Sequence, residues 1–243
     1  MKITRFLIGF ARSLVFLFRR PIYVTLMGGP GAGKGTVAQT LAPELGLAHL
    51  STGALMRREV EKKTPLGQSI EKIMKAGKLV PDEIVFKLLE QELERPANWR
   101  GAILDGFPRT RAQAEWLTAL FGKWHTRLTV AVQLEVPEAD IIERLSGRRV
   151  CSNTSCGTTY HVTFNPPKTE GVCDKCQSAL MQRADDKPEV VLARLVEYRA
   201  AQAPILAYYG EVGGLWSIHT TNKNTPAQVL ANVKSAVLAS SKR

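Results

Sequence analysis

Residues 28–36 of the chain are Gly-Gly-Pro-Gly-Ala-Gly-Lys-Gly-Thr, and they follow an apolar, β-branched run at 22–27, Ile-Tyr-Val-Thr-Leu-Met. The run predicts a buried parallel strand, and residues 37–45 predict a helix after the loop. The spacing Gly-x4-Gly-Lys that ends at Lys34 is typical of a phosphate-binding loop, although Gly35 stands where such loops usually have Ser or Thr. Glycines let backbone N–H groups point into one concavity, the helix presents its positive end, and the ammonium adds a charge for the β- and γ-phosphates. The sequence therefore predicts a nucleotide-phosphate site in an α/β fold.

Further along the chain, apolar runs alternate with helical stretches. We expect buried strands at 102–104, 128–134 and 215–219, a closing helix at 226–239 and a frayed tail at 240–243. Strands that alternate with helices favour a parallel sheet with helices on both faces. The predicted fold class is therefore α/β, with a three-layer core around a parallel sheet.

The composition is that of an ordinary globular protein. The 243 residues include 44% apolar and 23% charged residues, which excludes a disordered, collagen-like or coiled-coil chain. Four cysteines are too few for a disulfide-dense scaffold. Lys and Arg number 33 and Asp and Glu 22, giving a formal net charge of +11. Such a balance suits nucleic acid, an anionic membrane or phosphorylated small molecules as partners.

Residues 1–20 form a basic and apolar N-terminal extension without acidic residues, whose five basic residues are Lys2, Arg5, Arg12, Arg19 and Arg20. Arg12 and Arg19 interrupt every window long enough to cross a membrane, and no small-residue cleavage site of a secretory signal precedes Pro21. Three interpretations stay open. The extension is a helix that packs on the body of the fold or frays, a basic amphipathic helix on a membrane surface, or a presequence for an organelle.

Seven further motifs occur in order beyond the phosphate loop, among them Leu-Asp-Gly-Phe-Pro-Arg-Thr at 104–110. Their positions are 51–57, 77–82, 104–110 (followed by Gln113), 144–149, 160–167, 182–186 and 194–198. Together with the Lys-Gly-Thr variant of the loop, they resemble the motifs of nucleoside monophosphate kinases, and in particular those of adenylate kinase of the long-lid, bacterial type. The resemblance runs from about residue 22 to 232, so it leaves out only the extension and the tail.

The resemblance implies a P-loop kinase core over residues 21–243 with two insertions, an AMP-binding arm at about 51–80 and a lid at about 147–186. It implies Mg²⁺-dependent, reversible transfer of the terminal phosphoryl group of ATP to AMP, giving two ADP, by a monomer in the cytoplasm. No catalytic base is needed, because the attacking phosphate of AMP is already an anion. Transfer requires in-line positioning, cations around the transferred oxygens and a lid that excludes water.

The resemblance also assigns roles to individual residues. The cations around the phosphates in transit would be Lys34, Arg109, Arg148, Arg183 and Arg194. The ATP-binding set would be Gly31, Ala32, Gly33, Lys34, Gly35, Thr36, Arg144, Arg148, Thr159 and Tyr160. The AMP-binding set would be Thr52, Arg57, Lys78, Leu79, Val80, Gly106, Phe107, Pro108, Arg109, Gln113, Arg183 and Arg194. Asp105 would orient Mg²⁺ through water, which suits a loop that has no hydroxyl directly after its lysine.

These residue types suit their roles chemically. Guanidinium groups, such as that of Arg109, offer paired N–H donors that match phosphate oxygens. Thr52 and Gln113 offer neutral hydrogen-bonding groups for the edge of the AMP adenine. The flat guanidinium of Arg144 would lie against the face of the ATP adenine. The segment 222–225, where the family contacts this adenine, matches poorly, so we assign no site residue there.

All four cysteines fall inside the expected lid with the spacing Cys-x4-Cys-x16-Cys-x2-Cys: Cys151, Cys156, Cys173 and Cys176. Two close pairs of thiols separated by a hairpin-sized insert are typical of a four-cysteine zinc ribbon. One structural Zn²⁺ would tie together a small lid that lacks its own core, and four thiolates leave no open position for catalysis. The first pair is two residues longer than the Cys-x2-Cys of the metal-bearing lids that it resembles. A reduced, metal-free lid and a disulfide stay open as alternatives.

Three alternative functions also stay open. A nucleoside monophosphate kinase of another base preference would share these motifs, since Thr52 and Gln113 favour adenine only by resemblance. A basic zinc-ribbon module that binds nucleic acid and hydrolyses ATP would account for the charge, but the lid lacks the interleaved aromatic and basic residues of a base-stacking surface. A kinase tethered to a membrane surface by residues 1–20 is the third. We expect ATP, AMP and ADP as partners and no nucleic acid.

Overall fold

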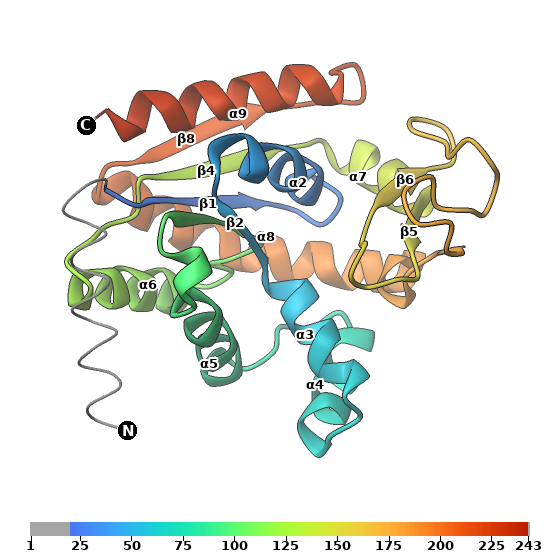
Figure 1. The fold of residues 1–243 in the computed structure, drawn as a ribbon, viewed down its shortest axis with the longest axis horizontal. Helices are drawn as coiled ribbons and strands as arrows, with labels where there is room; N and C mark the ends of the chain where they lie inside the picture. Colours follow the sequence, from blue (N-terminus) through green and yellow to red (C-terminus); the bar gives the residue numbers. More distant parts are fainter. Residues whose placement is uncertain (1–19, 243) are drawn as a thin grey trace.

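The structure is a computed structural model that describes residues 20–242, with the backbone alone at Pro188. Its centre is a five-stranded parallel sheet in the order β2-β3-β1-β4-β8 (Figure 1). The strands are β1 (Ile22–Gly28), β2 (Ala48–Ser51), β3 (Gly101–Asp105), β4 (Val130–Glu135) and β8 (Leu215–His219). The predicted α/β class with a parallel sheet is confirmed.

The strands follow the apolar runs closely. Those predicted at 22–27, 102–104 and 215–219 are present. The strand predicted from residue 128 begins at Val130 instead, because Thr129 bonds to Tyr23 just ahead of the β1–β4 ladder. The Tyr23 N–H donates to Thr129 Oγ1 at 3.1 Å, and the Thr129 N–H donates to the Tyr23 carbonyl oxygen at 2.8 Å.

Helices cover both faces of the sheet, so the core has three layers (Figure 1). The covering helices are α2 (Lys34–Leu45) and α9 (Pro226–Ser241) on one face, and α5 (Asp82–Leu93), α6 (Arg111–Lys123) and α8 (Pro188–Glu211) on the other. Successive side chains of a strand point to opposite faces, so β1 serves both layers. Val24 and Leu26 pack toward α2 and α9, whereas Tyr23 and Met27 pack toward the other helices.

The closing helix α9 starts at a capping box. The Gln228 N–H donates to Thr225 Oγ1 at 3.2 Å, and the Thr225 N–H donates to Gln228 Oε1 at 2.8 Å. At its far end the Ser241 hydroxyl donates to the Leu238 carbonyl oxygen at 3.0 Å and extends the last turn. The tail predicted to fray from residue 240 is therefore wrong for residues 240 and 241, which are helical.

Two segments project from this core (Figure 1). The first is the helix pair between β2 and α5, α3 (Thr52–Glu61) and α4 (Pro65–Lys75). The second follows α7 (Glu138–Ser146) and contains an antiparallel sheet in the order β6-β5-β7, with the strands β5 (Arg148–Cys151), β6 (Thr159–His161) and β7 (Leu180–Met181). The 3-10 turns are η1 (Pro96–Asn98) and η2 (Ala184–Asp186). We call residues 51–80 the arm and residues 147–186 the lid, and their extent as separate units stays a prediction.

The N-terminal extension lies outside the described residues, apart from Arg20. Its three interpretations therefore stay predictions. Across residues 20–242, every helix is too short or too polar to cross a membrane.

Candidate active site

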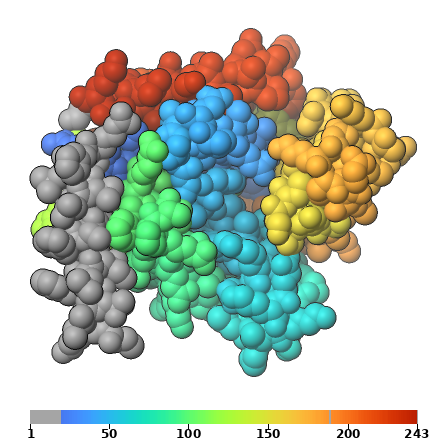
Figure 2. Space-filling view, in the orientation of Figure 1, coloured from blue at the N-terminus to red at the C-terminus, as the bar shows by residue number. Residues whose placement is uncertain are grey.

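A cleft of about 1500 Å³ opens at the carboxyl edge of the central sheet. Parallel strands direct their carboxyl ends to one edge, so the segments that follow β1, β3 and β8 meet there. In the space-filling view the lid (yellow and orange) stands beside the arm (cyan) at this side of the molecule (Figure 2). The predicted nucleotide and magnesium residues that line the cleft are Gly31, Ala32, Gly33, Lys34, Gly35, Thr36, Arg57, Lys78, Val80, Asp105, Arg109, Arg144, Arg148, Thr159, Tyr160, Arg183 and Arg194.

The phosphate loop has a backbone shape that favours glycine. Gly28, Gly31 and Gly33 have positive φ angles of 143°, 75° and 90°. A Cβ at Gly28 would also lie 2.6 Å from a backbone carbonyl oxygen of β4. Lys34 begins α2, and its Nζ donates to the carbonyl oxygens of Gly28 and Gly29, both at 2.7 Å. The ammonium is therefore held over the loop, at the helix end that favours phosphate.

Burial lowers the pKa of Lys34 to about 7. The carboxylate of Asp105 opposes the shift, whereas the guanidinium groups of Arg109, Arg194 and Arg148 add to it. Phosphate oxygens beside the amine would favour its charged form and reverse the shift. The loop therefore combines a desolvated amine with a shape that suits an anion.

His49 on the neighbouring strand β2 holds Asp105 at the end of β3. The Asp105 Oδ2 lies 3.3 Å from His49 Nε2. Burial raises the pKa of Asp105, but the hydrogen bond with His49 and the charge of Lys34 outweigh it, so the pKa lies below its usual value. A Cβ at Gly35 would lie 3.4 Å from Oδ2, an ordinary van der Waals contact, so the carboxylate lies directly beside the phosphate loop. An ionised carboxylate beside the phosphate loop fits a group that orients Mg²⁺ through water.

Three arginines from different parts of the chain line the same cleft. Arg57 lies on α3, Arg109 follows β3, and Arg183 precedes η2. Burial is the main cause that lowers the pKa of each, to about 10 for Arg109 and about 9 for Arg183, and neighbouring arginines add to the shift. The Arg109 Nε donates to the Gly106 carbonyl oxygen at 2.9 Å, which fixes its orientation. Cations that have already lost water together favour a multiply charged anion.

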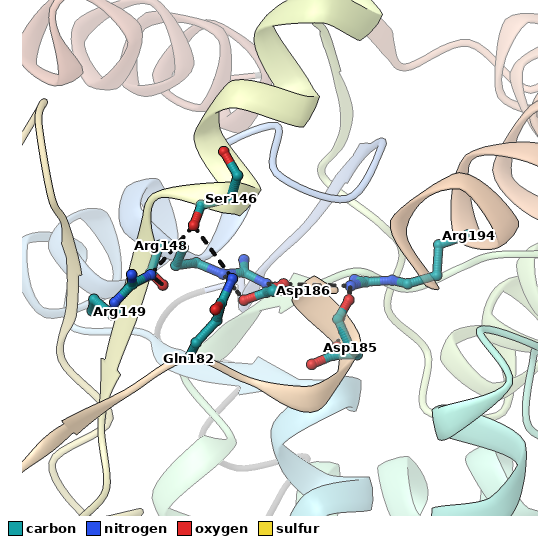
Figure 3. Close-up of polar contacts among 7 residues, drawn as sticks. All are labelled: Ser146, Arg148, Arg149, Gln182, Asp185, Asp186 and Arg194. Atoms are coloured by element: carbon teal, nitrogen blue, oxygen red, sulfur yellow. Dashed lines mark hydrogen bonds and ion pairs between the residues drawn. The ribbon is translucent and has the colours of Figure 1, made fainter. Parts of the chain in front are cut away.

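Two aspartates at the end of the lid hold the other two arginines that were predicted to surround the phosphates (Figure 3). Asp186, whose side chain is fully buried, accepts two hydrogen bonds from Arg148, one of them from Nε at 2.8 Å. Arg194 on α8 donates to the Asp185 carbonyl oxygen at 2.8 Å and lies 3.2 Å from the Asp185 carboxylate and 3.7 Å from Asp186. Asp186 therefore connects a lid strand to α8. The sequence analysis gave these aspartates no role, although two adjacent acids after Arg183 were a signal for one.

A smaller cavity of about 80 Å³ adjoins the cleft on the α8 side. Lys34, Arg109 and Arg194 line both cavities. Three more of the predicted AMP residues line the smaller cavity: Leu79, Gly106 and Pro108.

Three predicted AMP residues lie beneath the cleft wall and line neither cavity. Thr52 and Gln113 are 2% exposed, and Phe107 is fully buried in the core. The Thr52 hydroxyl donates to a carbonyl oxygen of the loop after β3 at 3.1 Å. The Gln113 amide donates to a carboxylate of α5 at 2.7 Å, and its oxygen accepts from the Arg109 N–H at 2.7 Å. These groups position the loop that carries Arg109, and their contact with adenine stays a prediction.

Arg144, predicted to lie against the ATP adenine, is held by a residue that the sequence analysis left out. Its Nε donates to Asn222 Oδ1 at 2.7 Å. Burial lowers the pKa of Arg144, whereas Asp140 and Glu143 oppose the shift. Asn222 lies in the segment after β8 and lines the cleft. Its position just beyond the last strand, at the carboxyl edge of a parallel sheet, was a signal for a site residue.

The four cysteines converge in the lid with distances that suit a metal. All four Sγ atoms lie within 4.8 Å of one another, with Cys151 and Cys176 3.3 Å apart and Cys156 and Cys173 3.8 Å apart. Tetrahedral zinc with Zn–S bonds of about 2.3 Å separates its sulfurs by about 3.8 Å. Burial raises the pKa of Cys173, but backbone N–H groups and the Tyr160 hydroxyl outweigh it and lower the pKa to about 6. The four free thiols therefore fit the donor set of a structural zinc site.

Tyr160, predicted to contact ATP, belongs to the wall between this cluster and the cleft. Its side chain is buried, and its hydroxyl accepts from the Asp174 N–H at 2.8 Å and lies 3.6 Å from Cys173 Sγ. The hydroxyl is thus used inside the lid. Contact between Tyr160 and ATP stays a prediction.

Comparison with known proteins agrees with these motifs. The family model described as Adenylate kinase matches residues 26–213. The adenylate kinase of Carboxydothermus hydrogenoformans is 46% identical over 212 residues, which cover 87% of this chain and 97% of that relative. The adenylate kinase of Symbiobacterium thermophilum is 42% identical over 220 residues, 90% of this chain and 100% of the relative. That of Moorella thermoacetica is 44% identical over 208 residues, 86% and 94% respectively.

Proposed function

The chain belongs to the adenylate kinase family and catalyses the reversible transfer of the terminal phosphoryl group of ATP to AMP, and we propose that the cations of the large cleft carry out this transfer. One observation supports the proposal above all. Among the Lys and Arg residues that line the cleft, six come from the phosphate loop, the arm, the loop after β3, the lid and α8: Lys34, Arg57, Arg109, Arg148, Arg183 and Arg194. Lone basic residues are common on protein surfaces, but one lysine and five arginines that are half-buried around a phosphate loop suit two nucleotides.

In this proposal the phosphate loop and Lys34 bind the β- and γ-phosphates of ATP, and Arg57 and Arg109 bind the phosphate of AMP. An oxygen of that phosphate attacks the γ-phosphorus and needs no base, because it is already ionised. The bond from the γ-phosphorus to the β,γ-bridging oxygen breaks, so that ATP leaves as ADP and AMP becomes the second ADP. Arg148, Arg183 and Arg194 supply the remaining charge around the transferred group. Mg²⁺ bound with ATP neutralises phosphate oxygens, and Asp105 would hold it through water.

The arm and the lid enclose this reaction. The arm carries Arg57, and the lid carries Arg148 and Arg183, so closure of both segments would complete the cage and exclude water. Asp186 supports this assignment, because its carboxylate connects lid residue Arg148 to α8. One structural Zn²⁺ held by four cysteines would stiffen the lid, and the sulfur spacing supports it.

The proposal includes a monomer in the cytoplasm with ATP, AMP and ADP as its partners, as the family resemblance implies. For residues 1–20, membrane-surface contact and organelle targeting are the alternatives to a cytoplasmic location. Size-exclusion chromatography with light scattering measures the oligomeric state. Sedimentation with anionic liposomes, for the full chain and for a variant that lacks residues 1–20, measures membrane contact.

The site assignment is tested by steady-state rates of Arg109→Ala and Arg183→Ala. Each variant should lose about two or more orders of magnitude in the rate of ADP formation, while its circular dichroism spectrum stays the same. Arg111→Ala is the matched control, because Arg111 is exposed, pairs with Glu115 on its own helix and does not line the cleft. Near-normal rates for either cleft variant would refute its role.

Base preference is tested with AMP, GMP, CMP and UMP as acceptors for ATP. The proposal expects AMP to react fastest. Faster turnover of another monophosphate would replace the assignment of AMP while leaving the phosphate cage intact.

A further inference from the structure

Asn222 lies between one cation and two carboxylates at the ATP end of the cleft. Its Oδ1 accepts from Arg144 Nε at 2.7 Å, and its Nδ2 donates to Glu143 Oε2 at 2.6 Å. Its backbone N–H donates to Asp140 Oδ2 at 2.7 Å. Three hydrogen bonds thus tie the segment after β8 to α7.

The sequence of α7 would pair Arg144 differently. Asp140 lies four positions before Arg144 on the same helix, a spacing that favours an ion pair, whereas the adjacent Glu143 does not face Arg144 on the helix. Within residues 20–242, however, no ion pair joins Arg144 to either carboxylate. Both carboxylates accept hydrogen bonds from Asn222 instead. The remaining N–H groups and the flat face of the Arg144 guanidinium therefore stay available to a ligand in the cleft.

We infer that Asn222 is a positioning residue for ATP: its side-chain amide holds the Arg144 guanidinium in the cleft, and its backbone N–H holds Asp140, the α7 acid with which Arg144 would pair. The inference rests on the proposed contact between Arg144 and the ATP adenine. In this inference Asn222 contacts Arg144 and contacts neither the phosphates of the nucleotides nor the reacting atoms.

The chemistry of the position requires an amide. A side chain between a guanidinium and a carboxylate must accept on one side and donate on the other, and Asn does both. An aspartate would still accept from Arg144 but would place its negative charge against Glu143. An alanine would do neither, and would leave Arg144 and Glu143 side by side without a bridge. Because the bond to Asp140 uses the backbone N–H, substitutions at this position isolate the effect of the amide.

The first test is Asn222→Ala. We expect the KM for ATP to rise about five- to tenfold, as for the loss of one or two hydrogen bonds, with the KM for AMP and the kcat within about twofold of the unaltered enzyme. A general loss of folded enzyme would lower the apparent kcat and leave both KM values unchanged. Asn98→Ala is the matched control, since Asn98 also donates a side-chain hydrogen bond, to the Glu92 carbonyl oxygen at 2.7 Å, and does not line the cleft.

The second test shows whether Asn222 acts through Arg144. Arg144→Ala alone should raise the KM for ATP, and adding N222A to it should raise that KM no further. If R144A leaves the KM for ATP unchanged, the proposed role of Arg144 is wrong. If R144A raises it and N222A does not, or if the two effects multiply in the double variant, only the inference about Asn222 is overturned.

The third test separates the two halves of the bridge. Asn222→Asp should raise the KM for ATP at least as much as N222A, because the acceptor is kept and the donor is lost. The double variant N222D/E143Q reverses the donor and the acceptor across the same 2.6 Å contact, so it should bring the KM back to within about twofold, whereas E143Q alone should not improve ATP binding. An N222D enzyme with an unchanged KM for ATP would overturn the inference.

Discussion

Lys34 supplies a positive charge to the site, and the same charge lowers the stability of the folded protein. Its amine is partly buried and donates hydrogen bonds to two loop carbonyl oxygens, and desolvation brings its pKa from 10.5 down to about 7. Between these values the unfolded chain binds a proton that the folded chain does not, so the free energy of unfolding rises with pH. At pH 7 and below, the desolvated charge of Lys34 lowers the free energy of unfolding by most of its full effect.

Lys34→Met should therefore stabilise the protein while abolishing phosphoryl transfer. We expect a gain on the order of 1–3 kcal/mol in the free energy of unfolding at pH 7, because the apolar chain removes the buried charge. The gain should shrink as the pH rises from about 7 toward 10, where the lysine is neutral in the folded protein. Urea unfolding of both proteins at several pH values measures this difference. A difference that does not change with pH would contradict the account.

Tyr209 is a second residue with an unfavourable polar group. Its hydroxyl is buried in the core beneath β1 and finds no hydrogen-bond partner among the described residues, and burial raises its pKa. Tyr209→Phe should raise the free energy of unfolding by about 1 kcal/mol, because a buried unsatisfied hydroxyl is removed without a cavity. The neighbouring Tyr208 donates to Thr118 Oγ1 at 2.8 Å, so Tyr208→Phe should lower stability by about the same amount. Equal effects of the two substitutions on the urea midpoint would be evidence against this assignment.

At the scale of elements, the join between β1 and β3 depends on Gly101. A Cβ there would lie 2.0 Å from the Ile22 carbonyl oxygen, and the φ angle of 123° is strained for any other residue. Gly101→Ala should destabilise the protein by about 3 kcal/mol or more, since the two central strands must separate. Gly122→Ala is the matched control, because the site is in α6 with nothing within 4 Å, and it should stabilise by about 0.5–1 kcal/mol. Thermal unfolding measures both, and a G101A protein as stable as G122A would overturn the claim.

The lid offers an element-scale test through its metal. Elemental analysis of the purified chain should find about one zinc per molecule. Cys173→Ser should lose the zinc and lower the melting temperature, because the lid sheet has only a small core around the sulfurs. Ser155→Ala, in the first loop of the same cluster, should leave the zinc content and the melting temperature unchanged. A chain whose lid resists amide hydrogen exchange equally with and without metal would contradict structural zinc.

Strands could be predicted from the sequence where apolar residues form a clear run. They could not be predicted where a segment forms a strand only because it pairs with a neighbouring strand. β1 and β3 match their apolar runs, because central strands of a parallel sheet are covered on both faces. β8 was also predicted from its apolar residues, although it is an edge strand of which only Ile218 is buried. β2 escaped prediction, since only Leu50 of its four residues is buried and the strand exists by pairing with β3 at the sheet edge. The end of α9 was also missed, because a serine there continues the helix through a local hydrogen bond.

Site residues could be predicted from the sequence where they belong to a local motif. Motif residues such as Lys34 and Arg109 line the cleft, because a motif fixes its own backbone. Their partners come from distant parts of the chain. Asp186 lies 38 positions from Arg148, and Asn222 lies 78 positions from Arg144, so no local pattern in one sequence indicates either pair. The fold brings these residues together.

For the whole molecule, the structure changes the interpretation of the positive net charge. The formal +11 includes five positive charges in residues 1–20, and ten of the remaining Lys and Arg residues line one cleft. Four thiolates with one Zn²⁺ would add −2 and bring the net charge to +9. The basic balance is therefore consistent with the phosphates of two nucleotides as partners.

The central claim is that this cleft passes a phosphoryl group directly from ATP to AMP. The most direct measurement is the stoichiometry of the reaction of the full chain with ATP, AMP and Mg²⁺, followed by separation of the nucleotides and assay of free phosphate. The account predicts two ADP for each AMP consumed, no free phosphate, and a rate lower by about two or more orders of magnitude in Lys34→Ala. Formation of ADP with free phosphate while AMP persists, or an unchanged rate in K34A, would contradict it.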